Sequence, residues 1–346
     1  MENKPKSWKF TFLNKIITGN SIDVLKEIPD KSINLVITSP PYFQQRNYTS
    51  IDSEIGNEDD IKEYIINIMK VFHECVRILR NDGSIVFNLG DKYFQSGLML
   101  VPYRFAIEAI ENEPVKIINH ITWIKKNPTP RQDKRKLVSS FEPFFIFVKS
   151  IKNYYFNKDE FLKSKDKKRK KNISSAFGQK YFSLVDESDL TEDEKEHARI
   201  ELQKVIEEVK KGETFDFRMK IRGIHAPAYG GMGGGRNNQI QKNGFTIIRM
   251  SGESMKKDLI ESAVESKNGW SHPAVYPESV ILELIKLLSK EENIVLDPFV
   301  GSGTTCIAAA KLGRRYIGID INQSYCDISR RRIGEIIKER NITDFI

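Results

Sequence analysis

The sequence predicts an α/β protein with a doubly wound, mostly parallel sheet and an inserted region of different character. Apolar strand patterns alternate with helical patterns from residue 15 to residue 156, as in a parallel sheet covered by helices. A second unit of strand, turn, helix and strand lies at residues 293–320. Between these parts, residues 163–238 lose the alternation and contain charge runs and glycines. At 346 residues, the chain can bury one large core and carry an appended module.

The first motif follows an apolar strand pattern, residues 33–37, which runs into TSPPY at residues 38–42. A proline cannot continue a hydrogen-bonded ladder, so the chain must turn out of the sheet there. The residue before each proline is held extended, which fixes the directions of the Ser39 and Pro40 carbonyls. The Ser39 hydroxyl, the Pro40 carbonyl and the Tyr42 ring could therefore hold a flat ring that bears an exocyclic amine. The structural alternative for this motif alone is a Pro-Pro turn with a packing tyrosine.

Helical periodicity follows at residues 61–79 and 102–111. Asp91 comes after a strand pattern, where it could line a pocket or cap a helix. Trp123 lies in another strand pattern and could form a further wall of the site. We expect it to pack in the core, because aromatic residues are core formers first.

The middle of the chain differs in composition from both flanks. Residues 163–171 read KSKDKKRKK, with seven basic residues and one acidic residue. Residues 186–208 are strongly acidic with helical spacing, and residues 222–238 are rich in glycine. The basic run could follow phosphates, although most lysine clusters are solvated faces or linkers. The glycine-rich segment could be a DNA clamp or a simple linker.

A second motif, NIVLDPFVGSGTT at residues 293–305, predicts a strand, a tight turn and a helix for a nucleoside cofactor. Gly301 and Gly303 let the backbone approach a ligand closely and adopt positive φ, and the helix that follows presents free N–H groups. The next strand ends in Asp320, at the spacing from Gly301 that is typical of the ribose-gripping acid of Rossmann-type sites. The dinucleotide fingerprint itself fails, because Cys306 stands in place of its third glycine.

With both motifs, the chain resembles the DNA amino-methyltransferases that use S-adenosylmethionine, the N4-cytosine and N6-adenine family. TSPPY is similar to the family's catalytic motif, and DPFVGSGTT is similar to its cofactor loop. The resemblance extends to blocks at residues 19–37, 86–93, 121–150 and 271–285. Because the catalytic motif precedes the cofactor motif, the order is that of the family's β group. It implies a circularly permuted, Rossmann-like methyltransferase fold, which chain ends near the surface make possible.

The resemblance implies base flipping followed by direct displacement. The target nucleotide would leave the duplex stack, and the tyrosine of TSPPY would stack on its base. The serine hydroxyl and the first proline's carbonyl would accept the amine hydrogens as the nitrogen attacks the methyl group, with positioning and electrostatics supplying most of the rate. The catalytic residues implied are Ser39, Pro40, Pro41 and Tyr42.

The resemblance also implies a site for S-adenosylmethionine, with no metal ion expected. Asp297 and the turn after it would hold the methionine part, and Asp320 would hold the ribose. Asn20 stands where family members commonly have an acidic residue that contacts the cofactor adenine. The cofactor-binding residues implied are Asp297, Pro298, Phe299, Gly301, Gly303, Thr304, Asp320 and Asn20.

The modified base is predicted from the first catalytic position. A serine there, in place of an acidic or amide residue, favours N4 of cytosine. The N6-adenine alternative stays open, because a hydroxyl and a carboxylate can each accept a hydrogen bond. No proline precedes Cys75, Cys306 or Cys326, so the Pro-Cys nucleophile of ring-carbon methylation is absent. The alternative of another class is a catalytically silent DNA-binding protein on the same fold, and RNA is a further candidate substrate.

Charge and resemblance predict the partners. A net charge of +8 favours a polyanion, and the family implies duplex DNA, a bacterial restriction-modification system and a possible cognate restriction endonuclease. The cysteines lack metal-ligand spacing. No apolar signal core and no run of about 18 apolar residues is present, so we expect a cytoplasmic protein without a membrane partner.

The motif order predicts a division of the chain into three parts. We expect residues 1–156 to form the catalytic half of the methyltransferase domain and residues 269–346 its cofactor-binding half. Residues 157–268 would be the target-recognition insert.

Overall fold

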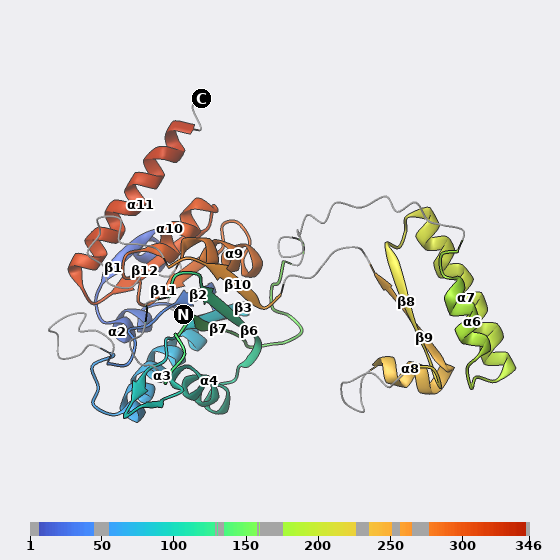
Figure 1. Ribbon diagram of the computed structural model, residues 1–346. Helices are drawn as coiled ribbons and strands as arrows, with labels where there is room; N and C mark the ends of the chain where they lie inside the picture. The colour runs from blue at the N-terminus through green and yellow to red at the C-terminus, as the bar shows by residue number, and fades with distance from the viewer. Residues whose placement is uncertain are drawn as a thin grey trace, which may run out of the picture. The chain divides into compact units, whose positions relative to one another are not determined.

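The computed structural model describes residues 7–44, 55–128, 130, 135–157, 159, 176–225, 235–250, 257–264 and 277–343. The chain forms two compact units (Figure 1). One unit combines residues 1–161 with residues 256–346, and the other consists of residues 162–255. The two ends of the chain therefore build one unit together, and the middle of the chain builds the other.

The sheet of the first unit has eight strands. Their spatial order is β1 (Lys15–Thr18), β12 (Arg315–Asp320), β11 (Ile294–Asp297), β2 (Ile33–Thr38), β3 (Leu79–Asn88), β7 (Phe141–Val148), β6 (Lys116–Lys125) and β10 (Leu259–Ser262). All neighbours are parallel except the pairs that β7 makes with β3 and with β6. This confirms the predicted mostly parallel sheet. The predicted insert included β10, whereas β10 pairs with β6 and extends the sheet.

The strand order reverses between β11 and β2. From β11 the chain continues to β12 on one side, and from β2 it continues to β3 on the other side. In a doubly wound sheet, ligands bind outside the carboxyl ends of the strands at such a switch point. Since β11 leads into the glycine turn and β2 leads into TSPPY, the fold brings the two predicted motifs to one place.

Helices cover both faces of the sheet and bury it (Figure 1). On β2, Val36 packs in a core cluster with residues of α3 (Ile61–Ile78) and α4 (Val101–Asn112). Leu35 and Ile37 pack in a second cluster with residues of α9 (Glu278–Leu288) and α10 (Thr304–Lys311). Successive side chains of β2 therefore point to opposite faces of the sheet, and both faces are buried. The helices are α1 (Ser7–Phe12), α2 (Ser21–Lys26), α3 (Ile61–Ile78), α4 (Val101–Asn112), α9 (Glu278–Leu288), α10 (Thr304–Lys311) and α11 (Gln323–Thr343), and β4 (Tyr93–Phe94) pairs with β5 (Gly97–Leu98). Of the helices in the described ranges, none is long and apolar enough to cross a membrane.

Several local predictions are confirmed. The helical patterns at residues 61–79 and 102–111 form α3 and α4. Asp91 caps a helix, because its Oδ1 accepts a hydrogen bond from Val101 N, the first residue of α4, at 3.0 Å. Trp123 is 3% exposed and packs in the core, and its indole nitrogen donates to Ser262 Oγ at 2.8 Å.

The second unit has its own small core around α7 (Glu192–Lys211), the helix predicted from the acidic segment. Its other elements are α6 (Gln179–Asp186), β8 (Asp216–Ile221), α8 (Gly235–Asn243) and β9 (Phe245–Met250), and β8 pairs antiparallel with β9. Acidic residues of α7 form ion pairs with Arg222 and Arg249. The basic run at residues 163–171 and residues 226–234 of the glycine-rich segment lie outside the described residues.

Candidate active site

The two motifs meet through a buried hydrogen bond at the carboxyl ends of β2 and β11. Thr38 Oγ1 donates to Asp297 Oδ1 at 2.6 Å, and Phe299 N donates to the same oxygen at 3.1 Å. The Asp297 residue is only 1% exposed. Two donors on one carboxylate oxygen stabilise its charge where water is excluded. Asp297 therefore fixes the turn after β11 against the strand that leads into TSPPY.

The glycine turn adopts the backbone that its sequence predicts. Gly301 and Gly303 have positive φ angles of 50° and 90°. Gly301 N donates to Asp320 Oδ2 at 2.9 Å, and Ser329 Oγ donates to Gly301 O at 2.6 Å. A Cβ at Gly303 would lie 3.0–3.2 Å from atoms of Ser329. These contacts fix the turn in a backbone shape that a larger residue at Gly301 or Gly303 could not adopt without strain.

The start of α10 fits a polar ligand. Thr304 is 4% exposed, and within the described ranges its hydroxyl has no hydrogen-bond partner. A buried hydroxyl without a partner costs about 1–3 kcal/mol. A polar ligand at the N-terminal end of α10 could remove this cost. The residues present therefore fit a nucleoside cofactor at this turn.

The lead-in block reaches the same turn. Asn20 is the N-cap of α2, and its Oδ1 accepts from Ile22 N at 2.9 Å. The neighbouring Ser21 hydroxyl donates to Pro298 O. Ser21 was not predicted as part of the site, and nothing in its sequence context distinguishes it from an ordinary first helical residue.

The hydroxyls of Ser39 and Tyr42 lie in a polar cluster with residues of β3 and β7. Ser39 Oγ lies 3.2 Å from Tyr42 OH and 3.2 Å from Asn88 Oδ1. The Tyr42 hydroxyl lies 2.9 Å from Asn88 Oδ1 and 2.9 Å from Glu142 Oε2. The opposite carboxylate oxygen of Glu142 forms an ion pair with Lys125 of β6. Residues of β3, β6 and β7 thus meet around TSPPY.

The two prolines differ in what their carbonyls do. The Pro41 carbonyl accepts a hydrogen bond from Tyr64 OH of α3 at 2.9 Å. Among the described residues, the carbonyl of Pro40 accepts no hydrogen bond. The Pro40 carbonyl therefore remains as an acceptor beside the Ser39 hydroxyl.

Gly90 leaves the space that the Tyr42 ring occupies. A Cβ at Gly90 would lie 2.4 Å and 2.5 Å from two ring carbons of Tyr42. Gly90, Asn88, Lys125 and Glu142 were not singled out from the sequence. The signal that could have found Glu142 is a lone carboxylate within the apolar strand FEPFFIFV.

The buried cysteines are unsuited to nucleophilic attack. Burial, and secondarily the nearby Asp297 carboxylate, raises the pKa of the Cys306 thiol well above its ordinary value. Burial likewise raises the pKa of the Cys75 thiol. Only the thiolate is an effective nucleophile. Among the described residues, no group of three or more His, Cys, Asp or Glu side chains could hold a metal ion.

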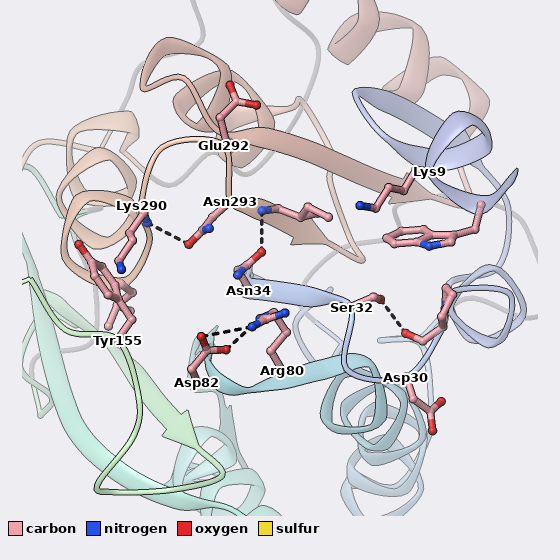
Figure 2. Close-up of a pocket in the computed structure, with 14 residues that line it drawn as sticks. Lys9, Asp30, Ser32, Asn34, Arg80, Asp82, Tyr155, Lys290, Glu292 and Asn293 are labelled. Atoms are coloured by element: carbon pink, nitrogen blue, oxygen red, sulfur yellow. Dashed lines mark hydrogen bonds and ion pairs between the residues drawn. The ribbon is translucent and has the colours of Figure 1, made fainter. Parts of the chain in front are cut away.

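A polar cavity of about 660 Å³ lies elsewhere in the first unit (Figure 2). It opens at the amino ends of the strands, where Asn34 of β2, Arg80 and Asp82 of β3, and Asn293 before β11 line it. The residues of TSPPY and of the glycine turn follow the carboxyl ends of those strands. The cavity is thus separate from the candidate active site.

Comparison with known proteins extends these observations. Residues 33–331 match the family model N6_N4_Mtase, described as DNA methylase. The Type II methyltransferase M.SfiI of Streptomyces fimbriatus is 26% identical over 389 residues, covering 90% of this chain and 88% of that protein. The cytosine-N4-specific PvuII DNA methyltransferase has a TM-score of 0.59 at 18% identity, covering 92% of this chain and 85% of that chain. The M1.HpyAVI–SAM complex has a TM-score of 0.50 at 16% identity, and the match covers 92% of this chain and 98% of that chain.

Proposed function

The chain belongs to the DNA methylase family whose model it matches over residues 33–331, and we propose that it methylates N4 of cytosine in duplex DNA. Enzymes of this family transfer a methyl group from S-adenosylmethionine to an exocyclic amine of DNA. The observation that carries the cytosine assignment is Ser39 at the first catalytic position, within hydrogen-bond distance of Tyr42 and Asn88. At this position the chain has a hydroxyl, whereas an acidic or amide residue there would favour adenine.

The geometry supports a specific way of holding the amine. Because the Ser39 hydroxyl can donate its own hydrogen to Tyr42 or Asn88, its lone pairs are available to accept an amine N–H. The Pro40 carbonyl would accept the second N–H. With both hydrogens engaged, the lone pair of the nitrogen is localised and aligned for attack. Tyr42, seated against Gly90, would stack on the flipped base.

The glycine turn would hold the cofactor. We assign Asp297, Pro298 and Phe299 to the methionine side, Asp320 to the ribose and Asn20 to the adenine. Gly301, Gly303 and Thr304 would line the turn between them. When bound, S-adenosylmethionine supplies an electrophilic methyl group on a sulfonium leaving group. The chain's residues bind it and orient it toward the amine.

The inserted unit is the proposed target-recognition region. It forms a compact unit of its own at residues 162–255, connected at both ends to the sheet unit. Because M.SfiI is a Type II methyltransferase, we also propose a role in restriction-modification with a cognate endonuclease.

Nucleoside analysis tests this function. The protein is incubated with S-adenosylmethionine and mixed-sequence duplex DNA, and the DNA is digested and analysed by mass spectrometry. N4-methylcytosine supports the proposal. N6-methyladenine would keep the amine chemistry and overturn the base assignment. If no methylated nucleoside forms, calorimetry with S-adenosylmethionine separates a silent DNA-binding protein, which gives no binding signal, from an enzyme whose target is absent from the DNA.

A further inference from the structure

We propose that Glu142 accepts the proton that the target amine loses, through a relay of the Ser39 and Tyr42 hydroxyls. The inference rests on the proposed function, and it assigns Glu142 a role that the family motifs do not describe. It follows from three contacts in the polar cluster and from the chemistry of amine methylation.

Methylation of an exocyclic amine leaves a proton to be removed. The nitrogen lone pair forms the new bond to the methyl carbon, and the electrons of the carbon–sulfur bond stay on sulfur. As the nitrogen–carbon bond forms, positive charge builds up on nitrogen, and it is relieved as one N–H bond breaks and its electron pair returns to nitrogen. A nearby group must take that proton, and a neutral serine cannot keep it.

The contacts form a chain from the serine to a carboxylate. Ser39 Oγ is 3.2 Å from Tyr42 OH, and Tyr42 OH is 2.9 Å from Glu142 Oε2. The serine oxygen would take the amine proton and pass its own to Tyr42, which would pass its own to Glu142. Both hydroxyls end unchanged, and the carboxylate becomes a carboxylic acid. Charge and atoms balance with no further reactant.

Asn88 does not provide an alternative acceptor. Its Oδ1 is within reach of both hydroxyls, but an amide does not take up a proton at neutral pH. Its Nδ2 is committed to Pro143 O at 3.0 Å. Asn88 therefore orients the two hydroxyls, and Glu142 is the acid at the end of the chain.

The surroundings of Glu142 suit a proton acceptor. The residue is 9% exposed, so its carboxylate is largely shielded from water. Lys125 of β6 pairs with one carboxylate oxygen, which leaves the other oxygen to face Tyr42. Lys125 and Tyr42 are the titratable side chains that contact Glu142 within the described ranges. The Lys125 side chain is 21% exposed, which gives the pair a connection to solvent.

The test uses Glu142→Gln in the full-length protein. The amide oxygen can still accept from Tyr42, but it cannot take a proton. In single-turnover methylation with duplex DNA, we expect the rate to fall by about 10²- to 10⁴-fold, the range for loss of a general base. Affinities for S-adenosylmethionine and DNA, and the fluorescence of 2-aminopurine placed at the target base, should stay at wild-type values. A rate within about threefold of wild type, or a loss explained by weaker binding or flipping, would overturn the proposal.

A second variant covers the case in which Glu142→Gln does not fold. Tyr42→Phe keeps the ring and interrupts the relay at its middle hydroxyl. We expect a similar loss of rate. We also expect the wild type to show a solvent deuterium isotope effect in single turnover and Tyr42→Phe to lose it. Where both variants fold, the double variant should be no slower than either one, because they interrupt one path. Additive losses, or an unchanged isotope effect, would overturn the relay. A wild type that methylates no DNA would instead remove the proposed function.

Discussion

Thr38 and Asp297 are 259 residues apart in the chain, and their side chains are joined by a 2.6 Å hydrogen bond inside the sheet unit. Thr38 ends the strand that leads into the loop at residues 39–42, and Asp297 ends the strand that leads into the loop at residues 298–303. The bond holds the two loops in register at the point where methyl donor and acceptor would meet.

Removing the Thr38 hydroxyl should loosen this connection. We expect Thr38→Val to lower the free energy of unfolding by about 1–3 kcal/mol, because it leaves a buried carboxylate with one donor fewer. Urea unfolding measures this, and calorimetry should show weaker binding of S-adenosylmethionine. Thr122→Val on β6 is the matched control, since among the described contacts its hydroxyl makes no hydrogen bond. Equal stability of the two variants would contradict the role of the bond.

The Ser39 hydroxyl should matter for turnover and not for cofactor binding. The hydroxyl accepts an amine hydrogen and is the first member of the proposed relay, so Ser39→Ala should slow methyl transfer by about 10²- to 10⁴-fold, as Glu142→Gln does. Single-turnover kinetics and calorimetry with S-adenosylmethionine measure the two properties separately. Full activity in Ser39→Ala would remove this hydroxyl from the mechanism.

Gly90 should tolerate no side chain. In Gly90→Ala the new Cβ would lie 2.4 Å from the Tyr42 ring, so the ring must move. We expect methylation to fall at least about tenfold, since small misplacements of a positioning group are costly. Gly97→Ala in the neighbouring β5 is the control, because its Cβ would meet the nearest atom at 3.6 Å. Similar activities for the two variants would argue against a fixed tyrosine ring.

Gly303 is predicted to control the cofactor turn. Gly303→Ala places a Cβ at φ +90°, against Ser329, and should destabilise the protein by about 1–2 kcal/mol and weaken binding of S-adenosylmethionine. Gly334→Ala in α11 meets no atom within 4 Å and should be neutral or stabilising, because alanine favours helices. Thermal unfolding and calorimetry distinguish the two. Wild-type affinity in Gly303→Ala would show that this backbone shape is not needed.

Stability should fall in alkaline solution because of the buried thiols. Burial raises the pKa of Cys75 and Cys306 in the folded protein, while the unfolded chain ionises thiols near pH 8.5. The contribution of the two thiols to the free energy of unfolding is complete below about pH 8.5. Above that pH it is lost, by up to about 1.4 kcal/mol per pH unit for each thiol. Urea unfolding between about pH 7.5 and about pH 9.5 should therefore show a shallower decline in Cys306→Ala than in the wild type. Parallel declines would contradict the prediction.

The elements with strong local signals could be predicted from the sequence. The turns at TSPPY and at the glycine motif could be predicted from their prolines and glycines, because these residues restrict or widen the dihedral angles of their own backbone. Glu142 could not be placed, because its contact with Tyr42 depends on β7 lying antiparallel beside β3. The sequence also did not show that β10 belongs to the sheet and not to the insert, because a four-residue edge strand carries little hydrophobic pattern of its own.

In the chain, the insert lies between β7 and β10. In the strand order of the sheet, β10 is the edge strand opposite β1, and β11, which leads into the glycine turn, lies in the half that contains β1. A change in the length or sequence of residues 162–255 therefore leaves every strand that carries the methyl-transfer residues with its neighbours intact. If this unit is the target-recognition region that we propose, the arrangement favours evolution by module exchange, in which related chains acquire new DNA targets while inheriting one chemical centre unchanged.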